Sequence, residues 1–172
     1  TVEDILGRAD LAMHHSKAAG RNAVRFFDPA MQARVVQRAT LQRELRHGLR
    51  DGELLLFGQP IVDERAQVCG HEALLRWRHP VRGMVPPDEF IPVAEQTGLI
   101  LPIGQWVLRE ACRVLARWAA DPLRAGWTLA VNLSARQLRQ PDFVDSVRQA
   151  LHAAGADPSR LKLELTESLL LH

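Results

Sequence analysis

The hydrophobic positions divide the chain into an N-terminal part with helical spacing and a longer part in which strands and helices alternate. Near the N-terminus, apolar residues recur every three or four positions, as on one face of a helix: Val2, Ile5, Leu6, Ala9 and Met13. Gly20 is well placed to end this helix, and residues 23–27 (AVRFF) predict a short strand. A second helix is predicted over residues 29–50, because Pro29 suits a first helical turn. Its thin apolar stripe on an Arg-rich surface is typical of a linker helix.

Beyond the second helix the pattern changes to short apolar runs, which predict strands. Residues 53–62 (ELLLFGQPIV) and 67–77 (QVCGHEALLRW) form two predicted strands, joined by a polar turn at 63–66. A loop rich in Pro and Gly follows at 79–87 and leads into a short predicted helix, DEFIPVAEQTG, at 88–98.

The second half of the chain alternates helix and strand. A long helix is predicted over 101–120, a strand over 128–134 (TLAVNLS), a helix over 141–154 and a final strand over 160–168 (RLKLELTES). The buried side of the long helix is expected to carry Trp106, Val107, Ala111, Val114, Leu115 and Trp118. This alternation predicts an α/β fold, a parallel sheet with helical crossovers that is either doubly wound or a barrel.

Composition narrows the classes of protein to which the chain can belong. Its 172 residues are 47% hydrophobic, which is enough for a substantial core, and its net charge of +2 is too small to predict nucleic-acid binding. Of the 22 basic residues only Lys17 and Lys162 are lysines, and the arginines are scattered rather than clustered. Two cysteines make no disulfide framework, so a reducing cytoplasm is expected. No apolar run reaches the roughly 18 residues of a membrane span, although a longer parent protein with an anchor elsewhere is compatible with this sequence.

Three predicted strands each carry one polar residue where a core residue is expected: Glu72, Asn132 and Glu164. In parallel α/β folds the carboxyl ends of neighbouring strands face a shared functional crevice. Two carboxylates and an amide offer the hard oxygen ligands that suit Mg²⁺ or Mn²⁺, and such an ion would compensate the charge of Glu72 in its apolar surroundings. The alternative is that each residue is separately a structural hydrogen-bonding group.

The segments EALLRW, NLSARQL and LELTES, in this order and at this spacing, resemble the EAL-domain phosphodiesterases. That family hydrolyses the bacterial second messenger cyclic di-GMP on a (β/α) barrel, with Mg²⁺ or Mn²⁺. The resemblance covers residues 51–172 and extends to three further segments: GQPIV, HPVRGMVPPDEFIPVAEQTGLI and GQWVLREAC. It implies that residues 51–172 form the N-terminal half of an EAL domain, a truncated part of a TIM-like barrel preceded by the linker helix.

A second resemblance concerns the N-terminal segment. Within residues 1–28, ADLAMHHSKAAGRN is similar to the last helix and strand of a GGDEF diguanylate-cyclase domain. The implied organisation is a GGDEF tail at 1–28, a linker helix at 29–50 and the EAL portion after it. The cyclase signature loop is absent from this segment, so no cyclase activity is expected from it.

The EAL resemblance implies a role for each matching acidic or amide residue. Glu72, Asn132 and Glu164 match the family's metal ligands, and Glu72 is therefore also expected to be catalytic. Glu167 matches a second catalytic acid, which supports a loop near the metals. Two divalent cations about 3.5–4 Å apart would shield the anionic diester and activate a water molecule, giving the linear dinucleotide.

Gln59 and Arg76 match positions that contact the nucleotide in the family. A guanidinium at Arg76 suits this role because its fork of donors can bind two phosphate oxygens together. A surface salt bridge is the alternative for Arg76, and an ordinary strand residue is the alternative for Gln59. Cys69 and His71 also raise a zinc hypothesis, but one strand supplies two ligands at best.

The chain also departs from the family pattern. It stops at His172, before the later strands that in the family carry an acidic pair, a lysine, a glutamate and a glutamine. A barrel of this class takes about 250 residues, so the chain alone is expected to be inactive and the activity to belong to the intact parent protein. The competing interpretation is a degenerate EAL domain that senses the nucleotide or acts as a scaffold. A smaller departure is Gly58, where the family usually has an aromatic residue before the Gln-Pro pair.

The helix at 29–50 is expected either to hold a homodimer or to be a solvated spacer, and the apolar final strand LKLEL could also pair with a second copy. If the helix holds a dimer, replacing both Val35 and Ala39 with Glu places charges in its apolar stripe and should shift the protein to monomer in sizing experiments. An unchanged oligomeric state in the double variant would remove the dimer hypothesis for this helix.

Overall fold

The computed structural model describes residues 1–3, 5–7, 9–10, 13 and 28–165. The predicted strand at 23–27 and the predicted catalytic residue Glu167 lie outside the described residues. The chain divides into two compact units, Thr1–Glu44 and Leu45–His172. Helix α2, Pro29–Asp51, confirms the predicted second helix. Within the described residues, none of the helices combines the length and the apolar character that crossing a membrane requires.

The second unit is built on a mixed sheet of five strands with the order β1-β2-β4-β5 and β3 paired to β2. Its strands are β1 Leu54–Val62, β2 Val68–His79, β3 Gly83–Val85, β4 Thr128–Leu133 and β5 Leu161–Leu165. The pairs β1–β2 and β2–β3 are antiparallel, whereas β2–β4 and β4–β5 are parallel. The parallel part matches the predicted helical crossovers, and the short β3 was not predicted.

The hairpin between β1 and β2 forms at the predicted polar turn. One carboxylate oxygen of Asp63 accepts hydrogen bonds from the backbone N–H groups of Arg65 and Gln67, both at 2.9 Å. Ala66 takes a left-handed backbone conformation with φ 57°, which closes the turn. An Asx side chain that binds the following N–H groups is the usual reason for Asp in such a turn.

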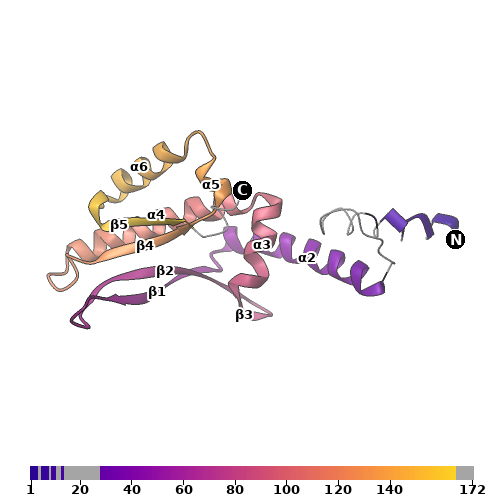
Figure 1. Ribbon diagram of the computed structural model, residues 1–172, viewed down its shortest axis with the longest axis horizontal. Helices are drawn as coiled ribbons and strands as arrows, with labels where there is room; N and C mark the ends of the chain where they lie inside the picture. The colour runs from indigo at the N-terminus through magenta and orange to yellow at the C-terminus, as the bar shows by residue number, and fades with distance from the viewer. Residues whose placement is uncertain (4, 8, 11–12, 14–27, 166–172) are drawn as a thin grey trace. The chain divides into compact units, whose positions relative to one another are not determined.

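The helices connect and cover the parallel strands: α3 Pro87–Thr97, α4 Ile100–Ala119, α5 Ala135–Leu138, α6 Phe143–Ala154 and the 3-10 turn η1 Pro158–Arg160. Helix α4 runs alongside β4, and α6 packs on α4 (Figure 1). Helices α3, α4 and α6 agree with the predicted segments, while α5 and η1 were not predicted.

The core lies between the helices and one face of the sheet. Alternate strand residues are buried on that face: Leu54, Ala73, Trp77, Leu129, Val131 and Leu133. Trp77 is completely buried, its ring lies 5.7 Å from that of Phe90 on α3, and its Nε1–H donates to Glu53 Oε2 at 2.9 Å. The indole therefore has both its apolar surface and its polar group satisfied.

The buried side of α4 agrees only in part with the sequence prediction. Val107, Ala111 and Leu115 are buried as predicted, whereas three predicted core residues are half-buried: Trp106, Val114 and Trp118. The buried stripe is completed instead by residues that were not predicted, including Ile103, Leu108 and Cys112. Large aromatic side chains at the edge of a helix face keep part of their ring in solvent, which residue type alone does not reveal.

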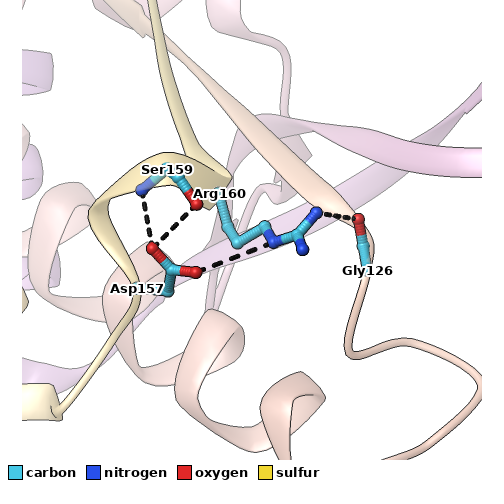
Figure 2. Close-up of polar contacts among 4 residues, drawn as sticks. All are labelled: Gly126, Asp157, Ser159 and Arg160. Carbon is cyan, nitrogen blue, oxygen red and sulfur yellow. Dashed lines mark hydrogen bonds and ion pairs between the residues drawn. The ribbon is translucent and has the colours of Figure 1, made fainter.

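A polar cluster fixes the start of β5 against the loop before β4, as Figure 2 shows. Asp157 accepts hydrogen bonds from the N–H and the hydroxyl of Ser159, at 2.9 and 2.8 Å, and these bonds hold the pKa of its carboxyl below the usual value. Arg160 lies between Asp157, at 3.8 Å, and the carbonyl oxygen of Gly126, at 2.6 Å. The cluster thus sets the position at which β5 enters the sheet beside β4.

An aromatic cluster closes the amino end of β2 on its helix-facing side. The ring of His71 lies 5.0 Å from Trp127 and 5.3 Å from Trp118, and its Nδ1 is buried without a hydrogen-bond partner among the described residues. Burial, and secondarily the charge of Arg124, lowers the pKa of His71 from its ordinary value of 6.5. A Cβ at Gly58 would lie 3.0 Å from this ring, so any side chain there would require His71 to shift slightly.

Protonation of His71 should destabilise the fold in acid. The unfolded chain takes up the proton near pH 6.5, above the lowered pKa of the folded state, so the free energy of unfolding should fall as pH drops below about 6.5. His71→Phe keeps a ring packed against the two tryptophans and removes the titration, so its denaturation midpoint should change less between pH 7 and 5. Replacing the exposed His152 with Gln should leave the dependence unchanged; an equal pH dependence in wild type and His71→Phe would contradict this assignment.

Candidate functional site

The structure brings two of the predicted metal ligands into direct contact. The amide Nδ2 of Asn132 on β4 donates a hydrogen bond to Oε1 of Glu72 on β2, at 2.6 Å. Asn132 lies directly opposite Glu164 on β5. Glu72 is half-buried, whereas Asn132 and Glu164 are exposed. Three neighbouring parallel strands therefore present two carboxylates and one amide on the same part of the sheet. The polar partner of the Glu72 carboxylate is the Asn132 amide.

The position of Glu72 along its strand differs from the prediction. Asn132 and Glu164 are each the penultimate residue of their strands, as expected for a crevice at the carboxyl ends. Glu72, however, lies inside β2, which continues to His79. The pairing of β2 with β4 ends at Ala73, and the rest of β2 pairs only with β1 and β3. Glu72 thus lies near the end of the parallel part of β2, because β2 continues beyond its pairing with β4 and pairs there only with β1 and β3.

The site residues share the face of the sheet that the helices do not cover. Residues directly opposite one another project to the same side, and one such row runs Gln59, Glu72, Ala130 and Lys162 across the four strands. The next row on the same face includes Asn132 and Glu164. Gln59, predicted from sequence to contact the nucleotide, is therefore the direct neighbour of Glu72.

Arg76 lies four residues beyond Glu72 on β2, and the alternation of side chains places both on the same face. Its Nη1 donates to the carbonyl oxygen of Leu75 at 2.9 Å, and its guanidinium carbon lies 5.9 Å from the centre of the Phe57 ring. It forms no ion pair with any residue in the described part of the chain, so the salt-bridge alternative has no support there.

A cavity of about 280 Å³ adjoins Arg76 and Asn132. Its wall is mostly apolar and comes from β2, β4, α3 and α4, with these members: Leu75, Ile91, Ile103, Val107, Val131 and Leu133. A mostly apolar hollow with a few polar groups at its border is the common form of a small-molecule site. This cavity lies between the sheet and helices α3 and α4, on the side of the sheet opposite to the carboxylates, and Arg76 and Asn132 border it.

The segment that follows Asn132 is held by a capping box at the start of α5. The backbone N–H of Gln137 donates to Oγ of Ser134 at 3.3 Å, and the N–H of Ser134 donates to Oε1 of Gln137 at 3.1 Å. Gly104 on α4 allows this approach, since a Cβ there would lie 1.9 Å from Nε2 of Gln137. Arg136 also donates to the carbonyl oxygen of Glu95 on α3, at 2.6 Å. The S-x-x-Q pattern could have revealed this cap from the sequence.

The donor atoms fit a divalent cation of the Mg²⁺ type. Glu72, Asn132 and Glu164 offer carboxylate and amide oxygens, which hard cations prefer. The 2.6 Å contact, which joins the amide nitrogen of Asn132 to Glu72, shows that these two side chains meet. Among the residues that the structure describes, no three His, Cys, Asp or Glu side chains are grouped to hold a metal. Cys69 and His71 therefore have no third ligand there, and the three oxygen donors form only part of a coordination shell.

Comparison with known proteins identifies a family to which this chain is similar. The model of the EAL domain matches residues 42–172. The chain is 45% identical over 169 residues to the bifunctional diguanylate cyclase/cyclic di-GMP phosphodiesterase MucR of Pseudomonas aeruginosa, covering 98% of this chain and 24% of MucR. It is 42% identical over 174 residues to the cyclic di-GMP phosphodiesterase NbdA of the same species, covering 99% of this chain and 22% of NbdA.

Solved structures agree in fold. The structure described as "PaMucR Phosphodiesterase, c-di-GMP complex" matches with a TM-score of 0.73 and 46% identity, over 77% of this chain and 54% of that one. The FimX EAL domain of P. aeruginosa bound to c-di-GMP matches with a TM-score of 0.66 and 29% identity, over 74% of this chain and 50% of that one. These likenesses confirm the predicted fold, a part of an α/β barrel.

The chain spans about a fifth to a quarter of the length of the curated relatives that it matches, and about half of the solved EAL structures. The family model nevertheless covers far more than half of this chain, and it includes every strand of the site. The chain belongs to the EAL-domain family.

Proposed function

We propose that the protein containing this chain hydrolyses cyclic di-GMP to the linear dinucleotide, and that this chain supplies the first part of its active site. The observation that carries the proposal is the contact of Asn132 with Glu72, with Glu164 opposite Asn132 on the next strand. Two relatives whose names state cyclic di-GMP phosphodiesterase activity, MucR and NbdA, are more than 40% identical to this chain over the matched region, which supports the same substrate.

In this proposal Glu72, Asn132 and Glu164 hold a divalent cation, Mg²⁺ or Mn²⁺. Such a cation, when bound, polarises the phosphoryl oxygens and lowers the pKa of a coordinated water molecule. The protein's own part is to orient the ligands: the hydrogen bond of Asn132 fixes the direction of the Glu72 carboxylate, and the neighbouring strands fix the spacing between Asn132 and Glu164. Glu167 is proposed to support a loop beside these ligands.

Arg76 and Gln59 are proposed to bind the substrate. The guanidinium of Arg76 can donate two parallel hydrogen bonds to a phosphate, and its approach to Phe57 keeps it on the open face of the sheet. Gln59, beside Glu72, offers an amide donor and an acceptor.

The domain organisation belongs to the proposal too. Residues 1–28 are proposed to end a GGDEF domain and residues 29–50 to link it to the EAL portion. The name of MucR includes both a diguanylate cyclase and a phosphodiesterase, and its likeness extends over 98% of this chain, which supports the presence of both kinds of domain in one protein.

The 172-residue chain alone is proposed to lack hydrolytic activity. Its described residues provide only three oxygen donors for metal, and its open sheet face leaves Asn132 and Glu164 in solvent. Catalysis of this kind depends on several preorganised charges around the transferred phosphoryl group, since a partial set loses most of the stabilisation.

The test is hydrolysis of cyclic di-GMP by the full-length protein and by the 172-residue chain, with and without Mn²⁺, the products being separated by chromatography. The full-length protein should form the linear dinucleotide in the presence of metal, and Glu72→Ala should lower the rate by roughly 100-fold or more, because a ligand to the metal is lost. The chain alone should form none.

Glu64→Ala, in the exposed turn between β1 and β2, is a matched control and should keep wild-type activity. Binding of cyclic di-GMP by the full-length protein without any linear product would contradict the proposed hydrolysis and favour the alternative, a non-catalytic sensor or scaffold. Metal-dependent product from the chain alone would contradict its proposed inactivity.

A further inference from the structure

We propose that Glu53 is a positioning residue of this site: by holding the indole of Trp77, it fixes the place at which β2 presents Arg76 to the substrate. The inference rests on the proposed function for the role of Arg76. The contacts that carry it join the sheet to helices α2 and α3, and they can be tested both with the nucleotide and without it.

The part of β2 that carries Arg76 has a neighbouring strand on one side only. The ladder with β4 ends at Ala73, and the pairing with β3 begins at Trp77. Of the strands in the described part of the chain, β1 alone pairs with residues 74–76. The distance between Arg76 and the predicted metal ligands is therefore not fixed by a direct ladder between their strands.

The contacts of the Arg76 side chain with described residues lie within the β1–β2 hairpin. Its Nη1 donates to the carbonyl oxygen of Leu75 on the same strand, and its guanidinium lies over the ring of Phe57 on β1. Both partners move together with the hairpin. The position of Arg76 relative to the rest of the domain must therefore come from the packing of neighbouring residues on β2.

Trp77, the next residue along β2, anchors this part of the strand in the core. Trp77 is completely buried, and its ring lies 5.7 Å from Phe90 on α3 and 5.3 Å from His79. Because side chains alternate along a strand, Trp77 enters the core on the face opposite to that of Arg76. An indole held in one orientation thus fixes the backbone from which Arg76 projects.

Glu53, directly before β1, is bonded to both residues that follow Arg76. Its Oε2 accepts a hydrogen bond from Nε1–H of Trp77 at 2.9 Å, and its carbonyl oxygen accepts one from the N–H of Arg78 at 2.9 Å. Its own N–H donates to the carbonyl oxygen of Gly48 in the last turn of α2, also at 2.9 Å. Glu53 therefore ties the end of β2 to the end of α2.

The last turn of α2 lies directly against the bond between Glu53 and Trp77. Gly48 is buried, and a Cβ there would lie 2.7 Å from Oε2 of Glu53 and 2.7 Å from Nε1 of Trp77. A hydrogen bond to a carboxylate is stronger than one between neutral groups, and shielding from water strengthens it further. This contact is thus suited to holding the indole in one orientation.

Loss of the Glu53 carboxylate should weaken substrate binding more than it slows the chemical step. The freed indole allows residues 74–76 to move, and a binding group that is displaced by about 1 Å loses much of its effect. Arg76 is proposed to bind the substrate rather than to react with it. A variant that lacks the carboxylate should therefore have a higher KM with little change in kcat.

The first test is calorimetric titration of the full-length protein with cyclic di-GMP in the absence of metal. Glu53→Ala should bind roughly 10-fold more weakly than wild type, whereas Glu53→Gln, which keeps an acceptor for the indole, should bind as wild type does. Arg76→Ala should also bind more weakly, and the double variant Glu53→Ala/Arg76→Ala should bind as Arg76→Ala does, because Glu53 acts through Arg76. Wild-type affinity in Glu53→Ala or in Arg76→Ala, or additive losses in the double variant, would overturn the proposal.

Leu115→Ala is the matched control for a general loss of stability. Leu115 is buried near the end of α4, whereas the α4 residues that border the cavity beside Arg76 lie in its first half. Leu115→Ala should lower the melting temperature at least as much as Glu53→Ala does, while its affinity for cyclic di-GMP and its KM stay at the wild-type values. An equal loss of affinity in Leu115→Ala, measured well below both melting temperatures, would assign the effect to destabilisation and overturn the proposal.

The second test, backbone hydrogen exchange of the full-length protein, needs no nucleotide. Glu53→Ala should raise exchange in residues 74–76 and leave residues 70–73, which pair with β4, at the wild-type rate. Unchanged exchange in 74–76, or an equal rise in both segments, would overturn the proposal. If wild type binds cyclic di-GMP without cleaving it, the proposed hydrolysis is wrong and the affinities still decide the role of Glu53.

Discussion

The parallel pairing of β2 with β4 is the contact on which the site depends. It extends over only four residue pairs, from Gly70 opposite Thr128 to Ala73 opposite Val131. A Cβ at Gly70 would lie 2.5 Å from the carbonyl oxygen of Thr128, so this approach of the two strands requires glycine. Without this short ladder, Glu72 would belong to the antiparallel strands β1 to β3 and Asn132 to the parallel pair of β4 and β5, and the two could not share a hydrogen bond.

The surrounding structure reinforces this ladder from both ends. On the helix side of the amino end, His71 packs against Trp118, near the end of α4, and Trp127, directly before β4. At the carboxyl end, the capping box of α5 holds the chain directly after Asn132. The backbone at the site is therefore fixed by packing and hydrogen bonds that do not involve the site side chains themselves.

Local patterns in the sequence were sufficient to predict most helices and strands, but not to predict how the strands pair. The hairpin, α4 and β5 follow from alternation, from helical spacing and from the Asp63 turn, which are all encoded within a few neighbouring residues. The interior position of Glu72 could not be predicted, because the length over which β2 keeps β4 as a neighbour depends on both strands. The half-buried state of Trp106 and Trp118 likewise depends on what packs beside α4. Of the site residues, Glu72, Asn132 and Glu164 are brought together as their spacing suggested, while Glu167 lies outside the described residues.

The two faces of the sheet have separate roles, one in stability and one in the site. The face toward the helices holds the buried apolar residues, and the opposite face holds Gln59, Glu72, Asn132 and Glu164, of which only Glu72 is half-buried. Substitutions at exposed polar positions usually change the free energy of unfolding little, whereas substitutions in the core usually lower it, by roughly 2–5 kcal/mol for a large side chain replaced by Ala. In the course of evolution the chemistry of such a domain can therefore be lost one residue at a time while selection still retains the fold, which leaves a stable scaffold free to acquire another use.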